Sequence, residues 1–173
     1  SAASDVYKRQ SLQVLYNMDV CRDDVESFIA RYRVNAILKE FGDGVETVEK
    51  ASQLSGAKPS EIIKTLIVIV DGEPVAVIVP GDRRLNYKKL SAVLKARNIR
   101  MARPDEVERY TGFEVGAVSP LSECIKRLRV IVDSQLLSIE SIWGGGGARN
   151  RLVFMATREL IDILRPMVAD ISA

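Results

Sequence analysis

Two apolar segments, 65–70 and 74–79, constrain the fold of this chain more than any other feature. They read Thr-Leu-Ile-Val-Ile-Val and Pro-Val-Ala-Val-Ile-Val, and they are joined through Asp71 and Gly72. β-Branched residues favour strands, and an Asp-Gly pair is typical of a tight hairpin turn. Neither segment alternates strictly between apolar and polar residues, so we expect both faces of both strands to be covered. The sequence therefore predicts a hairpin at the centre of a sheet with helices packed on it.

The rest of the chain predicts a mixed α/β (α+β) domain around this hairpin. Apolar periodicity and capping residues predict helices at 24–32, 47–54, 59–63, 86–96, 105–110 and 158–164. Further strands are expected at 35–41, 99–102, 129–132, 138–143 and 152–155, with a long loop at 111–121 and a four-glycine turn at 144–147. We expect a single domain over 24–173, built on a twisted, mixed and mostly antiparallel sheet flanked by helices. Residues 1–23 are expected to be an N-terminal extension, in part derived from cloning.

Composition is ordinary for a globular protein, with 47% hydrophobic and 28% charged residues among 173. Apolar runs such as 66–70 are far shorter than the roughly 20 residues that cross a bilayer, and the N-terminal region does not resemble a signal peptide. The two cysteines, Cys21 and Cys124, are too few for a disulfide framework or a zinc cluster. We therefore expect a cytoplasmic protein with no membrane association, no metal and no cofactor.

The chain contains no histidine. This absence excludes the Ser-His-Asp and Cys-His arrangements, the HExxH zinc site and the commonest general base. If the protein is an enzyme, its chemistry must depend on lysine, carboxylates, backbone amides or the substrate itself.

Basic residues gather in one stretch although the net charge is only +2. They are Arg83, Arg84, Lys88, Lys89, Lys95, Arg97, Arg100 and Arg103. A local basic face of this kind can meet phosphate, whereas the alternative is an ordinary solvated surface.

Lys64 directly precedes the first apolar segment. A lysine at a strand edge can simply extend its ammonium group to water, or it can serve as a cation for a bound ligand. The loop at 111–121 offers a second candidate, because Gly116 and Pro120 form a Gly-x-x-x-Pro pattern. Glycine lets such a loop turn its amides outward, and proline fixes the far end, as an oxyanion site requires.

The glycine run 144–147 is not a nucleotide-binding loop, because it lacks both GK[ST] and the GxGxxG spacing. One interpretation is a bulged turn that needs glycine for its backbone. Another is a flat wall beside a ligand, with Trp143 and Arg149 at its rims.

These elements in this order resemble the YbaK family. The motifs are Ile63-Lys64-Thr65-Leu66, the hairpin, Thr111-Gly112 through Pro120-Leu121, and a late Gly-Gly-x-Arg ending at Arg149. The family comprises aminoacyl-tRNA deacylases that include YbaK, ProX and the editing domain inserted in bacterial prolyl-tRNA synthetases. The resemblance covers about residues 24–171, and it implies a YbaK-like fold.

The resemblance also implies an activity, which is hydrolysis of the ester that joins a wrong amino acid to the terminal adenosine of a tRNA. Lys64 matches the essential lysine that holds the 3′ end of the substrate, and we expect it to be the catalytic residue. The expected substrate-binding residues are Thr111, Gly112, Gly116, Ala117, Ser119, Pro120, Gly145, Gly146 and Arg149. Candidate contacts to tRNA phosphates are Arg83, Arg84 and Lys88.

We therefore expect a trans-acting deacylase for tRNA(Pro) carrying a small amino acid such as alanine or cysteine, with prolyl-tRNA synthetase as a candidate partner. The chain departs from the prolyl-synthetase editing domains near the glycine turn, where they have a histidine and this chain reads Ala148, Arg149 and Asn150. Two alternatives stay open. One is a non-catalytic module that binds tRNA or a synthetase, and the other is a small-molecule phosphate binder at the glycine turn.

Overall fold

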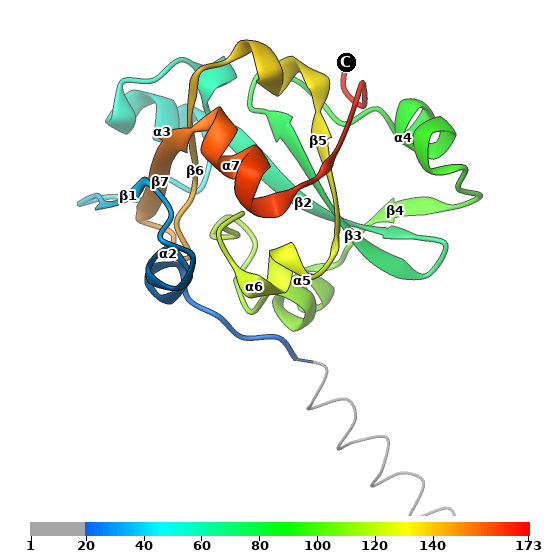
Figure 1. Ribbon diagram of the computed structural model, residues 1–173, viewed down its shortest axis with the longest axis horizontal. Coiled ribbons are helices and arrows are strands. Elements are labelled where there is room, and N and C mark those ends of the chain that lie inside the picture. The colour runs from blue at the N-terminus through cyan, green and yellow to red at the C-terminus, as the bar shows by residue number, and fades with distance from the viewer. Residues whose placement is uncertain (1–19) are drawn as a thin grey trace, which may run out of the picture.

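The computed structural model describes residues 20–173, which fold into two sheets with helices packed around them (Figure 1). The helices are α2 (Val25–Tyr32), α3 (Val48–Ser55), α4 (Tyr87–Leu94), α5 (Pro104–Thr111), α6 (Glu123–Lys126) and α7 (Thr157–Leu164), with 3₁₀ helices η1 (Pro59–Glu61) and η2 (Ser134–Ser138). The strands are β1 (Ala36–Glu40), β2 (Ile63–Val70), β3 (Glu73–Pro80), β4 (Ile99–Met101), β5 (Arg129–Asp133), β6 (Ser141–Gly145), β7 (Arg151–Ala156) and β8 (Met167–Ala169). Most of the expected extension, residues 1–19, lies outside the described residues.

The expected hairpin is confirmed as the centre of the larger sheet, whose strand order is β4-β2-β3-β5-β8. Strands β2 and β3 pair antiparallel over their whole length, from Ile63 opposite Pro80 to Val70 opposite Glu73. At the turn, Asp71 and Gly72 both have positive φ, 48° and 89°, as a type I′ hairpin turn requires. Strand β5 then pairs parallel to β3, and β8 pairs parallel to β5, so the sheet is mixed.

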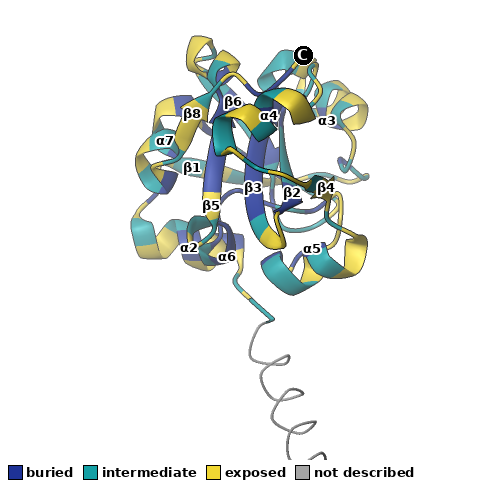
Figure 2. Ribbon diagram, turned by 90° about the vertical axis from the view of Figure 1, so that its right-hand side faces the viewer, coloured by how far each residue is buried: buried dark blue, intermediate teal, exposed yellow. Residues whose placement is uncertain are grey.

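Both faces of this sheet are covered, as the continuous apolar pattern predicts. On one face Ile67 and Ile78 join the main core, which extends to the smaller sheet and to α2 and α7. On the other face Val68 and Val77 pack in a second core with Leu90 of α4. Figure 2 shows β3 and β5 as buried strands between these layers.

The smaller sheet has the order β1-β7-β6 and is antiparallel. Two expectations about this region are wrong. Strand β6 begins at Ser141, not at residue 138, because Ser138 ends the 3₁₀ helix η2. Its last residues, Gly144 and Gly145, pair with β7 and are therefore strand rather than turn. Pairing with a neighbouring strand overrides the low strand propensity of glycine.

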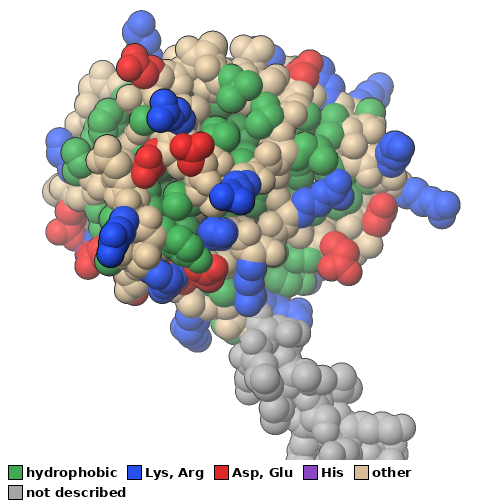
Figure 3. Space-filling model, in the orientation of Figure 1, with side chains coloured by type: hydrophobic (Ala, Val, Ile, Leu, Met, Phe, Trp, Pro, Cys, Tyr) green, Lys and Arg blue, Asp and Glu red, His purple; other side chains and the backbone are tan. Residues whose placement is uncertain are grey.

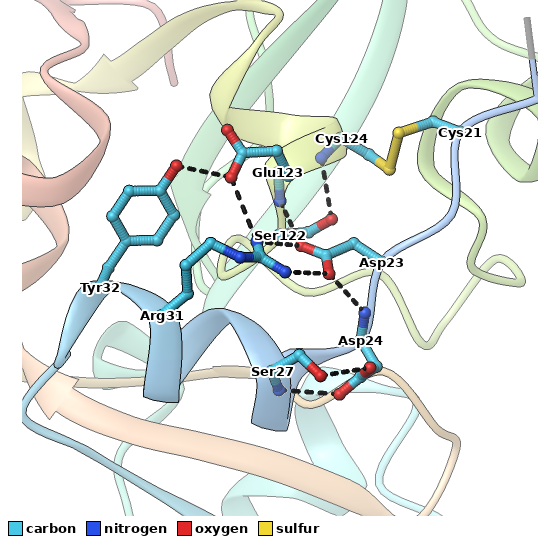
Figure 4. Close-up of polar contacts among 9 residues, drawn as sticks. All are labelled: Cys21, Asp23, Asp24, Ser27, Arg31, Tyr32, Ser122, Glu123 and Cys124. Atoms are coloured by element: carbon cyan, nitrogen blue, oxygen red, sulfur yellow. Dashed lines mark hydrogen bonds and ion pairs between the residues drawn. A yellow bond between two sulfur atoms is a disulfide. The ribbon is translucent and has the colours of Figure 1, made fainter.

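An N-terminal junction, formed by residues 21–32 and the start of α6, ties the beginning of the described chain to the domain (Figure 4). Cys21 and Cys124 form a disulfide, which the cysteine count did not suggest. Beside it, the Asp23 carboxylate accepts a hydrogen bond from the Glu123 backbone N–H at 2.7 Å. The Arg31 guanidinium pairs with both carboxylates, at 3.3 Å to Asp23 and 3.2 Å to Glu123.

Among the described helices, none combines the length and apolar character that crossing a bilayer demands.

The disulfide should contribute substantially to stability, because 103 residues separate its two cysteines. Closing so long a loop restricts the unfolded chain, and native disulfides contribute about 2–4 kcal/mol. We expect a reducing agent to lower the free energy of unfolding by about this amount in urea titrations. The double variant Cys21→Ser/Cys124→Ser is the control, since its unfolding curve should not respond to the reductant. A wild-type curve that is equally insensitive would contradict the prediction.

Candidate active site

A cavity of about 430 Å³ opens beside the N-terminal half of β2. This volume lies within the range of small-ligand sites, roughly 300–1,000 Å³. Its lining comes from five segments within residues 45–51, 62–67, 101–107, 115–118 and 144–152. Most of these side chains are apolar, so a few polar groups must determine how a ligand is oriented.

Strand β2 is paired unequally along its two edges, and the cavity lies beside the part that β4 does not cover. Strand β4 pairs only with Val68–Val70, and the backbone N–H of Ala102 donates to the Ile67 carbonyl at 3.0 Å. Residues 63–67 border the cavity instead. Since the backbone groups of every second residue point to the same edge of a strand, the N–H and C=O of Thr65 are directed to the cavity side like those of Ile67.

Thr65 and Glu46 are two polar residues of the cavity wall that were not among the expected site residues. The Thr65 Oγ1 atom and the Glu46 Oε2 atom are buried and have no hydrogen-bond partner among residues 20–173. Hydrogen bonds from its own backbone N–H and from Lys50 lower the pKa of the Glu46 carboxyl, so this group is charged at neutral pH. Thr65 and Glu46 are thus polar residues in a mostly apolar lining.

Lys64 is the cation of this site. It is the second residue of β2, opposite Val79, and its half-buried side chain lines the cavity. Its Nζ atom donates a hydrogen bond of 2.5 Å to the main-chain oxygen of Arg83. Burial lowers the pKa of Lys64, the nearby Arg84 cation lowers it further, and Asp82 partly offsets both. An ammonium group has three donors, so two remain for a ligand.

The loop after α5 forms the opposite wall through Val115, Gly116 and Val118. Gly116 has a φ of 89°, and a Cβ atom there would lie 3.0 Å from the Cβ of Glu46. Glycine is therefore required both by the backbone conformation and by the close approach. The Ala117 amide is bonded within the loop to Glu114 O at 3.0 Å, so it does not point freely at a ligand.

The glycine run forms the third wall. A Cβ atom on Gly145 would clash with the carbonyl oxygen of Val118, so glycine lets the loop pack directly on β6. The amides of Gly146 and Gly147 donate to Arg151 O and Ala117 O, each at 3.0 Å. These two amides already have hydrogen-bond acceptors within the protein. The geometry therefore favours a flat wall beside the cavity over a turn that binds an anion.

The expected site residues fall into two groups. Lys64, Gly116 and Gly145 line the cavity. The remaining expected binding residues are not among its lining: Thr111, Gly112, Ala117, Ser119, Pro120, Gly146 and Arg149. Several of these support the walls instead. The Thr111 hydroxyl donates to Val107 O at 2.6 Å, and Arg149 forms an ion pair of 3.3 Å with Glu114 of the loop.

The three basic residues expected to contact phosphate also differ from one another. Arg84 and Lys88 are exposed, whereas the Arg83 guanidinium bonds to Ser172, with 2.6 Å from Nε to Oγ and 3.2 Å to the main-chain oxygen. The face shown in Figure 3 carries basic and acidic side chains interspersed, so no single charge sign dominates that face. Among residues 20–173, no group of three His, Cys, Asp or Glu side chains is placed to hold a metal ion.

The model of one protein family, described as the aminoacyl-tRNA editing domain, matches residues 43–163, which is more than half of the chain. The chain belongs to this family. The resemblance expected from the motifs around Lys64 and residues 111–121 is therefore confirmed for the family. The matched range includes all five segments from which the cavity lining of this editing domain is drawn.

Three similar proteins agree with this assignment. A proline–tRNA ligase of Oleidesulfovibrio alaskensis is 38% identical over 107 residues, which are 61% of this chain and 18% of the ligase. The editing domain thus spans less than a fifth of the length of that relative. A hypothetical protein of known structure matches with a TM-score of 0.79 and 36% identity, covering 87% of this chain and 100% of that one. A candidate trans-editing enzyme for prolyl tRNA synthetase matches with a TM-score of 0.73 and 27% identity, covering 80% and 87%.

Gly145→Ala should destabilise the editing domain, because the added Cβ meets the Val118 carbonyl. Overpacking of this kind costs about 1–3 kcal/mol and should also displace the loop wall of the cavity. The measurement is the free energy of unfolding in urea. Gly42→Ala is the matched control, since nothing lies within 4 Å of a Cβ at that position. If both variants unfold like the wild type, the packing of loop against strand is not as described.

Proposed function

We propose that this editing domain is a trans-acting aminoacyl-tRNA deacylase. Its proposed substrate is mischarged tRNA(Pro) that carries a small amino acid such as alanine or cysteine. The observation that carries the proposal is the placement of Lys64, whose half-buried side chain lines a mostly apolar cavity of small-ligand size. Membership of the aminoacyl-tRNA editing family connects such a cavity to an aminoacyl ester.

The reaction is hydrolysis of an activated ester. A water molecule attacks the carbonyl carbon, the tetrahedral intermediate carries an oxyanion, and the bond to the ribose oxygen then breaks. The ribose oxygen takes a proton, and a free amino acid leaves. The neighbouring ribose hydroxyl can orient the water or carry this proton, so the reaction needs no histidine, metal or cofactor from the protein.

Lys64 supplies charge stabilisation in this scheme. Its two remaining N–H donors can meet a phosphate of the 3′ end or the developing oxyanion. An aminoacyl group also carries a free α-ammonium group, and Glu46, whose carboxylate pairs with Lys50 at 3.0 Å, is a residue of the same cavity wall. In this scheme Glu46 would be the acidic residue that meets the amino end of the substrate.

The apolar lining supports a small, apolar amino acid as the part that is removed. Val45, Ala51 and Ile63 leave a space in which each additional methylene changes binding by about 1–3 kcal/mol. A mostly apolar lining cannot strongly reject a similar molecule that adds a hydroxyl. We therefore expect discrimination by size more than by polarity.

Trans action is supported by the two structural neighbours, because their chains have nearly the extent of this domain. The name of one neighbour and the ligase relative both point to prolyl-tRNA synthetase as the partner. The domain would meet tRNA through the 3′-terminal adenosine at the cavity and through the acceptor stem outside it. The site of action would be the cytoplasm, where aminoacyl-tRNA is made and used.

A deacylation panel tests this function. Purified protein is mixed with tRNA(Pro) charged with alanine, cysteine, serine or proline, and loss of the ester is followed. We expect release of a small non-cognate amino acid, with proline retained. Lys64→Ala should slow this release by about 100-fold or more, the effect of losing one stabilising donor. The exposed Lys39, which is absent from the cavity lining, provides the control Lys39→Ala.

Two outcomes would contradict the proposal. If tRNA binds but no ester is lost, the protein is a binding module. If Lys64→Ala and Lys39→Ala behave alike, the activity is present but does not depend on Lys64.

Arg84 and Lys88 are the proposed contacts to acceptor-stem phosphates. They are exposed and close in sequence to Arg83, whose main-chain oxygen binds Lys64. The double variant Arg84→Ala/Lys88→Ala should weaken tRNA binding and reduce the slope of log K against log salt by about one for each lost contact. Lys39→Ala/Arg158→Ala removes the same charge elsewhere and should leave the slope unchanged. Equal slopes in both double variants would exclude Arg84 and Lys88 from the interface.

A further inference from the structure

The position of the Lys64 ammonium group depends on a main-chain oxygen rather than on a carboxylate. Its hydrogen bond to Arg83 O, at 2.5 Å, orients the side chain. A lysine side chain is a flexible four-carbon stem, so its charged end needs such an anchor to occupy one place. A carbonyl anchor orients the ammonium without neutralising it, and the full charge stays available for a substrate. The place of Lys64 Nζ is therefore set by whatever holds residue 83.

The segment that contains Arg83 is held by residues 170–173. Arg84 and Ala173 exchange two backbone hydrogen bonds, both 2.9 Å. The Asn86 backbone N–H donates to Ile171 O at 2.8 Å. The Arg83 side chain adds the bonds from its guanidinium to the hydroxyl and the main-chain oxygen of Ser172. Arg83 thus bonds to Lys64 through its backbone and to Ser172 through its side chain.

A buried carboxylate in turn fixes the 170–173 segment. Asp133, the last residue of β5, is fully buried. It accepts a hydrogen bond from the Ser172 hydroxyl at 2.7 Å and one from the Ile171 backbone N–H at 3.1 Å. The Ser172 hydroxyl donates to Asp133 and accepts from Arg83 Nε. It therefore links residue 83 to the end of strand β5. A continuous chain of hydrogen bonds runs from Asp133 through Ser172 and Arg83 to Lys64.

We propose that Arg83, Ser172 and Asp133 are positioning residues for Lys64, which hold its ammonium group at the cavity for the deacylation proposed above. This inference rests on the proposed function for its catalytic meaning, but the positioning itself can be observed without any activity. None of the three residues lines the cavity, so they act on the reaction only through Lys64. In this proposal Arg83 acts by orienting Lys64, whereas the sequence suggested a contact to phosphate.

The pair Arg83→Gln and Arg83→Met tests the proposal. A glutamine places a neutral N–H donor where Arg83 Nε lies and can keep the bond to Ser172. Methionine has similar length but no donor. Both variants lose the charge, so a contact to tRNA phosphate would be lost equally in the two. Only a positioning role of Arg83 predicts a difference between the two variants.

The first readout is the set of NMR signals from the Lys64 side chain. These signals are assigned by their absence in the Lys64→Arg variant. In Arg83→Met we expect the Lys64 ε-methylene signals to show increased mobility. We also expect its pKa to rise, because a released ammonium group regains water. Arg83→Gln should retain the wild-type signals. This readout decides the positioning claim even if the wild-type protein proves inactive on every tRNA.

The second readout is the single-turnover deacylation rate. A displacement of about 1 Å can cost on the order of 100-fold, so Arg83→Met should be about 10- to 100-fold slower, and Arg83→Gln close to wild type. If Arg83→Met does not fold, as judged by circular dichroism, Ser172→Ala replaces it, because it removes the same hydroxyl bridge. Identical Lys64 signals in the wild type and in the donor-free variant would overturn the proposal. Where the wild type is active, equal rates for Arg83→Gln and Arg83→Met would also overturn it.

Discussion

The unequal pairing of β2 is the constraint on which the rest of the structure depends. Along one edge β2 bonds to β3 over its whole length, and along the other it bonds to β4 only at Val68–Val70. Main-chain pairing with β3 holds the strand in place, and the open part borders the cavity. Lys64 thus stands on a fixed support at the place where the sheet leaves room for a ligand.

Close backbone approach shapes the cavity from the other sides. Gly116 brings the loop against Glu46, and Gly145 lets the same loop pack on β6. Any side chain at these two positions would push the walls apart. The glycine run therefore has a steric role, and its amides at Gly146 and Gly147 are used within the protein. The glycines shape the walls and their amides bind within the protein. This arrangement suits a site in which one cation, rather than a group of backbone amides, supplies the positive charge.

The polar residues behind the cavity connect its lysine to distant parts of the chain. Asp133 is buried, and a buried carboxylate persists only where hydrogen bonds compensate the loss of water. Its partners Ile171 and Ser172 belong to the segment that pairs with residues 84–86. The buried carboxylate thus fixes residues 171 and 172, and these hold the segment whose Arg83 main-chain oxygen binds Lys64. The hydrogen bonds that compensate the buried Asp133 carboxylate and the hydrogen bond that orients Lys64 belong to one network.

Local patterns predicted what depends on neighbours in sequence. The hairpin follows from β-branched runs around Asp71 and Gly72, and α2, α3 and α4 follow from their caps at Asp24, Thr47 and Asn86. The strand character of Gly144 and Gly145 was missed because it comes from pairing with β7. The three-residue strand β8 was missed because its only support is the parallel edge of β5. The low strand propensity of glycine and the short length of β8 do not indicate that a neighbouring strand will pair with these residues.

The sequence by itself determined the central hairpin, the candidate lysine and the family. These depend on residue types at short spacing, which a linear reading preserves. Tertiary structure decided the open edge of β2, the disulfide between Cys21 and Cys124, and the anchor of Lys64 on Arg83. Each of these joins residues far apart in the chain, and periodicity or propensity describes only neighbours. Their positions follow from the packing of the two sheets and the helices against one another, which no single segment encodes.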